Sequence, residues 1–119
     1  MSQFGFENLE VYKKAVGFVK EVYSLTKSWP KEERFSLTDQ FRRASTSIAL
    51  NLAEGTSGSK KEFKVYINRA RGSCFECAAI LDVALSLDLI TEKTRKIFYD
   101  KITELSKMLI GLKSSLSNE

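Results

Sequence analysis

Apolar residues recur every three or four positions along most of the chain, which is the spacing of one face of an α-helix. The pattern is interrupted at Pro30, at Thr56–Gly58 and just before Thr91. It predicts helices over residues 8–28, 37–54, 60–87 and 92–116. Because the connections are short, successive helices should run antiparallel. We therefore expect one all-α domain over residues 1–119, an up-down-up-down four-helix bundle.

Local signals agree with these limits. Pro30 should end the first helix, and Gly55 is placed to end the second in a left-handed C′ conformation. Ser59 with Glu62 forms a capping-box pattern for the third helix, and Thr91 is an N-cap residue for the fourth. The first helix carries two neighbouring apolar stripes, so it is apolar over roughly half its circumference, wider than the usual stripe of about 100°. The stripes are Leu9, Tyr12, Val16, Val19, Tyr23 and Thr26, and Val11, Ala15, Phe18, Val22, Leu25 and Trp29.

The third helix also has small and apolar residues on the side away from its core stripe. Four of them follow one line, namely Val65, Gly72, Ala79 and Val83. Small residues at this spacing let another helix approach closely. We expect the line to be a subunit interface in a homo-oligomer, since monomers rarely expose such patches. The alternative is a few incidental apolar surface residues.

A polar stripe borders the predicted core on the second and third helices. Its members are Gln40, Ser47, Asn51, Glu54, Arg69, Ser73 and Glu76. We expect them to form a structural network that fixes helix register, with Arg69 neutralised by a nearby carboxylate. The alternative is a metal-dependent or small-molecule enzyme in which Glu54 and Glu76 act as an acid/base pair. No nucleophile, phosphate loop or metal set accompanies them, so we predict no catalytic residues.

Positive charge is concentrated in the middle of the chain. Residues 40–71 carry seven Lys/Arg and two Asp/Glu, a net +5, whereas the whole chain carries +4. Counting ~1.5 Å per residue from the turn puts Arg42 and Arg71 about level across the hairpin. Such a surface suits phosphate binding driven by shape and charge. We expect little base readout, because no aromatic residue is clearly interleaved with the cations. The candidate nucleic-acid-binding residues are Arg42, Arg43, Lys60, Lys61, Lys64 and Arg71.

The amino-acid composition excludes several other classes of function. The chain has no histidine and two cysteines, so a His-based triad or a complete four-ligand zinc site is impossible within one chain. Cys74 and Cys77 have C-x-x-C spacing, but they lie in the middle of a helix and on its core stripe, which favours packing over redox chemistry. We expect no cofactor or metal. There is no secretory signal or membrane-spanning segment, so we expect a cytoplasmic protein without membrane contact.

The segment from Ser36 to Glu76 carries a family resemblance. It reads SLTDQFRRASTSIALNLAEG, then SKKEF, then ARGSCFE. With the opening Phe6–Tyr12, it resembles the 23S rRNA intervening-sequence proteins over nearly the whole chain. The most specific parts are Gln40 with Arg42 and Arg43, Asn51–Gly55, and Gly72-Ser73 with Glu76.

The resemblance implies a bacterial four-helix-bundle protein that assembles as a homopentamer and has no enzymatic activity. A similar fold occurs in the accessory variability determinant of diversity-generating retroelements, which looks like a partner of a reverse transcriptase and of nucleic acid. We therefore expect a non-catalytic, RNA-associated scaffold that binds itself and RNA or DNA. The alternative is a protein–protein adaptor that docks a partner enzyme such as a reverse transcriptase.

Overall fold

The computed structural model describes residues 4–33 and 36–116, so the expected domain limits at residues 1 and 119 lie outside the described residues. Its four helices are α1 (Glu10–Thr26), α2 (Leu37–Gly55), α3 (Lys60–Ser86) and α4 (Glu92–Ser115), with short 3-10 helices at Gly5–Asn8 and Lys31–Glu33. Every predicted limit lies within two residues of the observed one. The described residues contain no strand, which confirms the all-helical fold.

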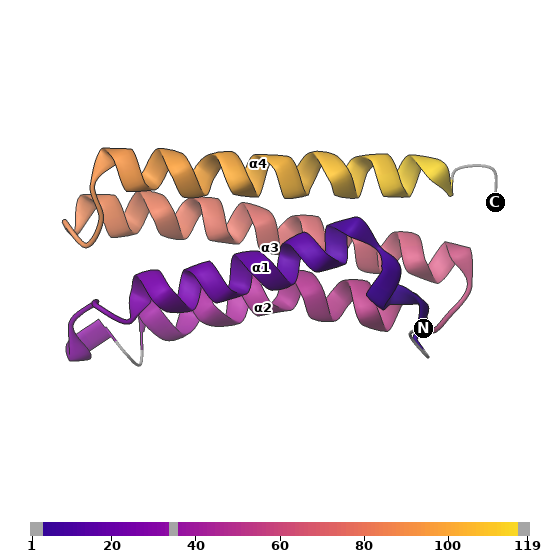
Figure 1. Cartoon of the computed structure of the whole chain (residues 1–119), viewed down its shortest axis with the longest axis horizontal. Coiled ribbons are helices and arrows are strands. Elements are labelled where there is room, and N and C mark those ends of the chain that lie inside the picture. The colour runs from indigo at the N-terminus through magenta and orange to yellow at the C-terminus, as the bar shows by residue number, and fades with distance from the viewer. Residues whose placement is uncertain (1–3, 34–35, 117–119) are drawn as a thin grey trace.

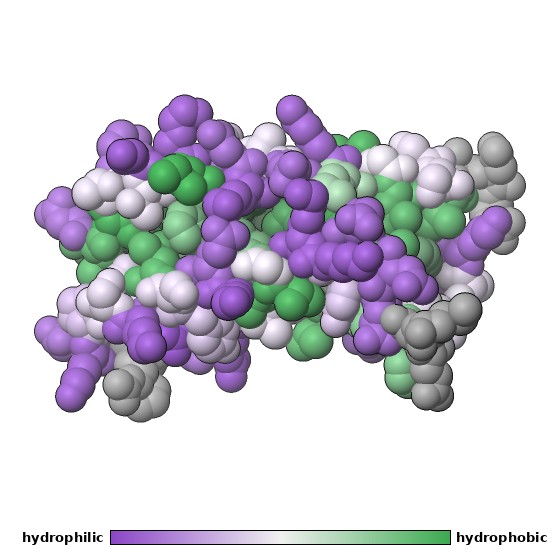
Figure 2. All heavy atoms as spheres, viewed as in Figure 1, coloured by the Kyte–Doolittle hydropathy of each residue, from purple (hydrophilic) through white to green (hydrophobic). Residues whose placement is uncertain are grey.

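The helices lie side by side and alternate in direction (Figure 1), consistent with a bundle of 45 × 24 × 22 Å. α2 packs extensively on α1 and α3, and α3 on α4, whereas α1 touches α4 least. Figure 2 shows polar side chains over most of the face seen in Figure 1, with apolar residues in the gaps between them. None of the described helices is long and apolar enough to cross a membrane.

The two apolar stripes of α1 are buried to different extents, although Leu9, Tyr12 and Thr26 of the less buried stripe also contribute to the core or its edge. Val11, Phe18 and Val22 are buried, whereas Val16 and Tyr23 are exposed. The limited contact between α1 and α4 explains the difference, because Val16 and Tyr23 of the less buried stripe have no helix among the described residues to cover them fully in the single chain. The aromatic pair of Phe18 with Phe98, whose ring centroids are 6.1 Å apart, is one of the contacts that do join α1 to α4.

Two predicted helix starts are confirmed. The Ser59 hydroxyl accepts from the Glu62 amide at 3.1 Å, and the Glu62 carboxylate accepts from the Ser59 amide at 2.9 Å, which completes the capping box. The hydrogen bond from the Ser59 amide to the Glu62 carboxylate, followed by the interaction of that carboxylate with the Ser59 side chain, lowers the pKa of Glu62. The Thr91 hydroxyl accepts from the Thr94 amide at 3.2 Å.

The predicted left-handed role of Gly55 is wrong. Gly55 is the last residue of α2, and no described glycine has a positive φ. Its function is close packing, because a Cβ at this position would lie 2.7 Å from Cβ of Tyr66 and 2.8 Å from Cδ1 of Phe63. The absence of a side chain lets α3 approach the end of α2.

The turn after α3 contains the left-handed residue instead. Asp88 has φ 60°, and the amide of Leu89 donates to the carbonyl of Ala84 at 2.9 Å. The Asp88 amide donates to the Leu85 carbonyl at 3.0 Å. This pair of bonds is a Schellman motif, with aspartate at the position where glycine is most common.

Candidate functional site

The polar stripe between α2 and α3 holds a short chain of hydrogen bonds. The Ser73 hydroxyl donates to the Ser47 hydroxyl at 3.0 Å, and the Asn51 amide donates to the same Ser47 oxygen at 2.9 Å. In the part of the chain that the structure describes, the exposed side chains of Gln40 and Glu76 join none of these bonds. The structure therefore brings together the middle of the predicted network and leaves Gln40 and Glu76, both at the end far from the hairpin turn, exposed to solvent.

Glu54 and Arg69 meet through a tyrosine. The Tyr66 hydroxyl donates to the Glu54 carboxylate at 3.1 Å, and Cζ of Arg69 lies 4.8 Å from the Tyr66 ring centroid. Arg69 thus stacks on an aromatic ring, and the expected direct neutralisation by a carboxylate is absent among the described ion pairs. Tyr66 was not among the predicted residues, although it precedes Arg69 by one helical turn.

The pairs Ser47–Ser73 and Glu54–Tyr66 fix the register of α2 against α3. At ~1.5 Å per residue, Glu54 and Glu76 are separated by roughly 15 Å along the hairpin. Paired catalytic carboxylates lie within about 5–10 Å. The geometry therefore disfavours an acid/base pair made from these two residues.

The same register corrects the predicted alignment of the arginines. Arg42 lies level with residue 78, which places it about 10 Å further along the bundle than Arg71. Counting from the turn failed because α3 begins beyond the end of α2, with Gly55 packed against Phe63 and Tyr66.

Arg42 and Arg43 have partners within the chain. Nε of Arg42 donates to the Thr26 hydroxyl at 2.8 Å, and its Cζ lies 4.5 Å from the Tyr23 ring centroid, so this arginine joins α2 to α1. Nε of Arg43 lies 3.2 Å from Asp39 Oδ2. The hollow beside both arginines also contains Asp39 and Glu54, so its charges balance.

Lys64 and Arg71 lie elsewhere, on the side of α3 that faces α4. They line a hollow of about 400 Å³ with Ile110, Lys113 and Ser114. Lys113 donates to the neutral amide oxygen of Asn68 at 3.0 Å, and no carboxylate of the described residues pairs with it. Lys60 and Lys61 are exposed at the start of α3, at the end of the bundle.

A second hollow, of about 420 Å³, continues along the same pair of helices. We call the two hollows together the α3–α4 seam. Its described lining includes four cations and no aspartate or glutamate; the cations are Lys64, Arg71, Lys107 and Lys113. The two lysines of α4 were not predicted, because they join the other two cations across helices and lie far from them along the chain.

Aromatic side chains also line the seam, contrary to the expectation that none is interleaved with the cations. Phe75 and Tyr99 are 65% and 44% exposed. Cζ of Arg71 lies 5.9 Å from the Phe75 ring centroid, and Cζ of Arg95 lies 5.1 Å from that of Tyr99. Both are (i, i+4) pairs on one helix, a spacing that was visible in the sequence.

The two cysteines are buried and free. Burial raises the pKa of Cys74 to about 12, an effect that the charge of Arg71 opposes. Burial, with the nearby Cys74 and Glu76, raises the pKa of Cys77 further. Both thiols are protonated at neutral pH, so they pack as small apolar groups and are poor nucleophiles and metal ligands. The described residues contain no cluster of three metal-binding side chains.

The predicted interface line on α3 is exposed in the single chain. Val65 and Val83 are 47% and 45% exposed, and Gly72 and Ala79 lie between them on the same side of the helix. A Cβ at Gly72 would meet nothing within 4 Å. At 100° per residue, this line lies about 100° around α3 from the seam. Lys64 and Arg71 lie well to one side of the line, whereas Phe75 lies next to it, three residues after Gly72 and four before Ala79.

The described residues thus form an all-helical bundle with a basic seam between α3 and α4. The model of the family "23S rRNA-intervening sequence protein" matches residues 7–111. This chain therefore belongs to the 23S rRNA-intervening sequence protein family, which confirms the resemblance found in the sequence.

Comparison with solved structures agrees with this assignment. A crystal structure of a protein of unknown function from the S23 ribosomal protein family of Bacteroides thetaiotaomicron superposes with a TM-score of 0.80. It is 25% identical, and the match covers 87% of this chain and 95% of the other. No curated protein matches the sequence.

Proposed function

We propose that this protein is a non-catalytic, cytoplasmic, RNA-associated scaffold that binds nucleic acid through the α3–α4 seam. The observation that carries the proposal is the lining of the seam, which holds four cations and no carboxylate among its described residues. A phosphate backbone is the ligand that best matches such a surface, because each neutralised phosphate releases a condensed counterion.

The structure changes which predicted cations we place at the interface. Lys64 and Arg71 remain, and Lys107 and Lys113 join them. Arg42 and Arg43 are less suited to phosphate because Thr26, Tyr23 and Asp39 already hold them. The exposed Lys60 and Lys61 would extend the contact toward the end of the bundle.

Self-association is the second part of the proposal. The exposed line of Val65, Gly72, Ala79 and Val83 would form the subunit contact, in a homo-oligomer that the family resemblance suggests is a pentamer. Each added subunit would repeat the seam. Several weak phosphate sites on one particle would then bind one RNA with far higher avidity than a single chain.

The test is fluorescence anisotropy of the full chain with a labelled structured RNA at several salt concentrations. We expect affinity to fall linearly on a log–log plot against salt. Replacing Lys107 and Lys113 by glutamine should reduce the slope by about one to two. The control replaces Lys13 and Lys96, which pair with Glu10 and Asp100 on their own helices.

The control loses the same net charge but leaves the seam intact. Equal weakening in both variants would show that the RNA responds to net charge alone and would overturn the seam as the site. No binding to the unchanged protein at low salt would overturn nucleic-acid binding altogether.

A protein–protein adaptor is the second candidate, and the hollow beside Arg42 favours it. This hollow measures about 590 Å³ and combines balanced charges with Leu50, which is largely exposed. A mixed apolar and charged surface suits a protein partner better than phosphate. Binding of a partner enzyme that survives nuclease and high salt, and that Leu50→Asp abolishes, would support this function.

A further inference from the structure

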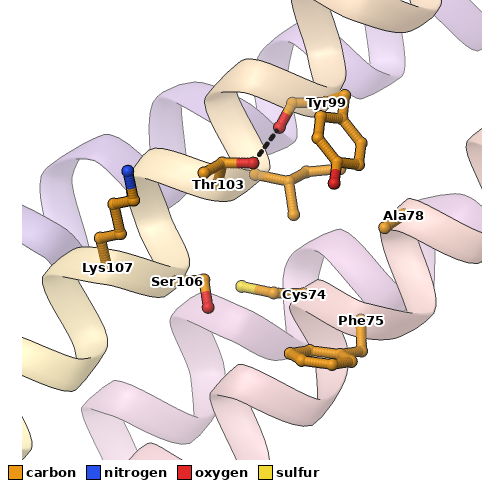
Figure 3. A pocket seen from close by; sticks show the side chains of 8 residues that line it. Cys74, Phe75, Ala78, Tyr99, Thr103, Ser106 and Lys107 are labelled. Carbon is orange, nitrogen blue, oxygen red and sulfur yellow. Dashed lines mark hydrogen bonds between the residues drawn. The ribbon is translucent and has the colours of Figure 1, made fainter.

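The half of the seam nearer Phe75 has a shape and chemistry that phosphate binding alone does not explain. Its hollow of about 420 Å³ lies between α3 and α4. Figure 3 shows Phe75 of α3 and Tyr99 of α4 on opposite sides of this hollow, with the Cys74 thiol between them and Ser106 across from it. The volume lies within the range of about 300–1000 Å³ that is typical of sites for small organic groups.

The walls of the hollow are suited to a flat aromatic group. Phe75 is largely exposed, although burying a phenyl ring is favourable. Nucleobases stack on such rings regardless of sequence, because every base has a π-face. The hydroxyls of Thr103 and Ser106 line the hollow. The Thr103 hydroxyl donates to the Tyr99 carbonyl at 3.0 Å, which leaves its oxygen able to accept.

The charges around the hollow would hold the phosphates that flank a base. Arg71 sits against the Phe75 ring, and Lys107 lines the hollow on the α4 side. The Arg71 guanidinium has no carboxylate partner among the described ion pairs, and its Nε is buried without a hydrogen-bond partner in the same residues. Aromatic faces interleaved with unpaired cations are the pattern of proteins that bind single strands.

We propose that the seam binds single-stranded RNA, with an unpaired base seated in the hollow against Phe75 or Tyr99 and the neighbouring phosphates on Arg71 and Lys107. This inference rests on the proposed function and narrows its ligand class. A duplex keeps its bases stacked inside the helix, so it can offer only phosphates to the seam. Single-stranded segments should therefore bind more tightly than duplex at equal length and salt.

The chain offers a matched control for the aromatic ring. Tyr23 is also about half exposed and also has an arginine over its face, with Cζ of Arg42 at 4.5 Å. The hollow there contains Asp39 and Glu54, which should repel phosphate. Phe75→Leu and Tyr23→Leu therefore each remove one exposed aromatic ring. The first ring lies in the seam, which should bind RNA, and the second lies beside carboxylates that should repel it. Phe75→Trp keeps a stacking surface in the seam.

The experiment measures anisotropy of labelled oligouridylate and of a labelled RNA duplex of the same length with the full-length protein. Oligouridylate should bind more tightly than the duplex. Phe75→Leu should weaken its binding roughly 5- to 150-fold, corresponding to ~1–3 kcal/mol for one stacked base. Tyr23→Leu should leave binding unchanged, and Phe75→Trp should retain it and show tryptophan quenching by the RNA.

Each outcome separates this inference from the proposed function. If oligouridylate and duplex bind equally, or if Phe75→Leu binds as well as the unchanged protein, base stacking is refuted while phosphate binding at the seam survives. If neither RNA binds at low salt, both proposals fail. If Phe75→Leu changes the native mass of the protein, Phe75 belongs to a subunit contact and the stacking role is overturned.

Discussion

Replacing Gly72 by leucine tests the proposed subunit contact with opposite expectations for a monomer and an oligomer. Gly72 lies inside the 27-residue helix α3 and is exposed, and a Cβ added there would have nothing within 4 Å. Glycine in a helix interior costs roughly 0.8–1 kcal/mol relative to alanine, and leucine is close to alanine. Within a single chain, leucine should therefore stabilise the fold.

The size of that stabilisation follows from chain length. An unfolding entropy of about 2.1 cal/mol/K per residue gives roughly 250 cal/mol/K for a chain of this size, so ~1 kcal/mol raises Tm by about 4 °C. In the proposed oligomer the leucine would instead stand where a second helix must approach. Helix axes pack about 8–10 Å apart, at distances set by the side chains at the contact. Assembly should then be lost.

Light scattering coupled to size exclusion would measure the native mass, and thermal unfolding at two protein concentrations would measure Tm. Gly17→Leu is the control, because Gly17 is an exposed glycine of α1 that also has nothing within 4 Å. We expect Gly17→Leu to keep the oligomer and Gly72→Leu to release chains of 13.5 kDa. An unchanged protein that is itself monomeric, or a Gly72→Leu variant of unchanged mass, would refute the contact.

Three further predictions concern packing, the turn and the thiols. Gly55→Ala should lower the free energy of unfolding by about 1–2 kcal/mol because its Cβ would overlap α3, whereas Gly17→Ala should raise it by up to ~1 kcal/mol; urea unfolding measures both. Asp88→Gly should stabilise the turn by about 0.5–1 kcal/mol because φ is 60° there, and a lower urea midpoint would contradict this. Because native Cys74 and Cys77 keep their protons well above pH 9 while unfolded thiols lose theirs, stability should fall as pH rises from 9 to 11, and the double alanine variant should lose that part of the slope.

The helices were predictable because the signals that define them are local. Apolar spacing, the Ser59–Glu62 capping box and the Thr91 cap all act within one or two turns, and the structure confirms each. The more complete burial of one stripe of α1 was not predictable in the same way. Both stripes are apolar, and the choice depends on how far α4 lies from α1, which no local signal specifies.

The register of α3 against α2 could not be predicted from the sequence. Gly55 looked like a turn residue, yet it permits close packing of Phe63 and Tyr66. That packing shifts α3 relative to α2 and moves Arg42 out of line with Arg71. A turn can be located from its residues, but the offset between two antiparallel helices depends on which side chains fit together.

The same limit governs the candidate site. Arg42 and Arg71 are equivalent as sequence features, but only the fold shows that Arg42 is held by Thr26 and Tyr23 while Arg71 faces Lys113 across the seam. A cation that is already paired with a group of the protein contributes little to binding an anion, whereas a cluster of unpaired cations attracts anions. The count of cations along a chain therefore indicates that an anionic ligand is plausible, and the pairing of those cations in the fold decides where it can bind.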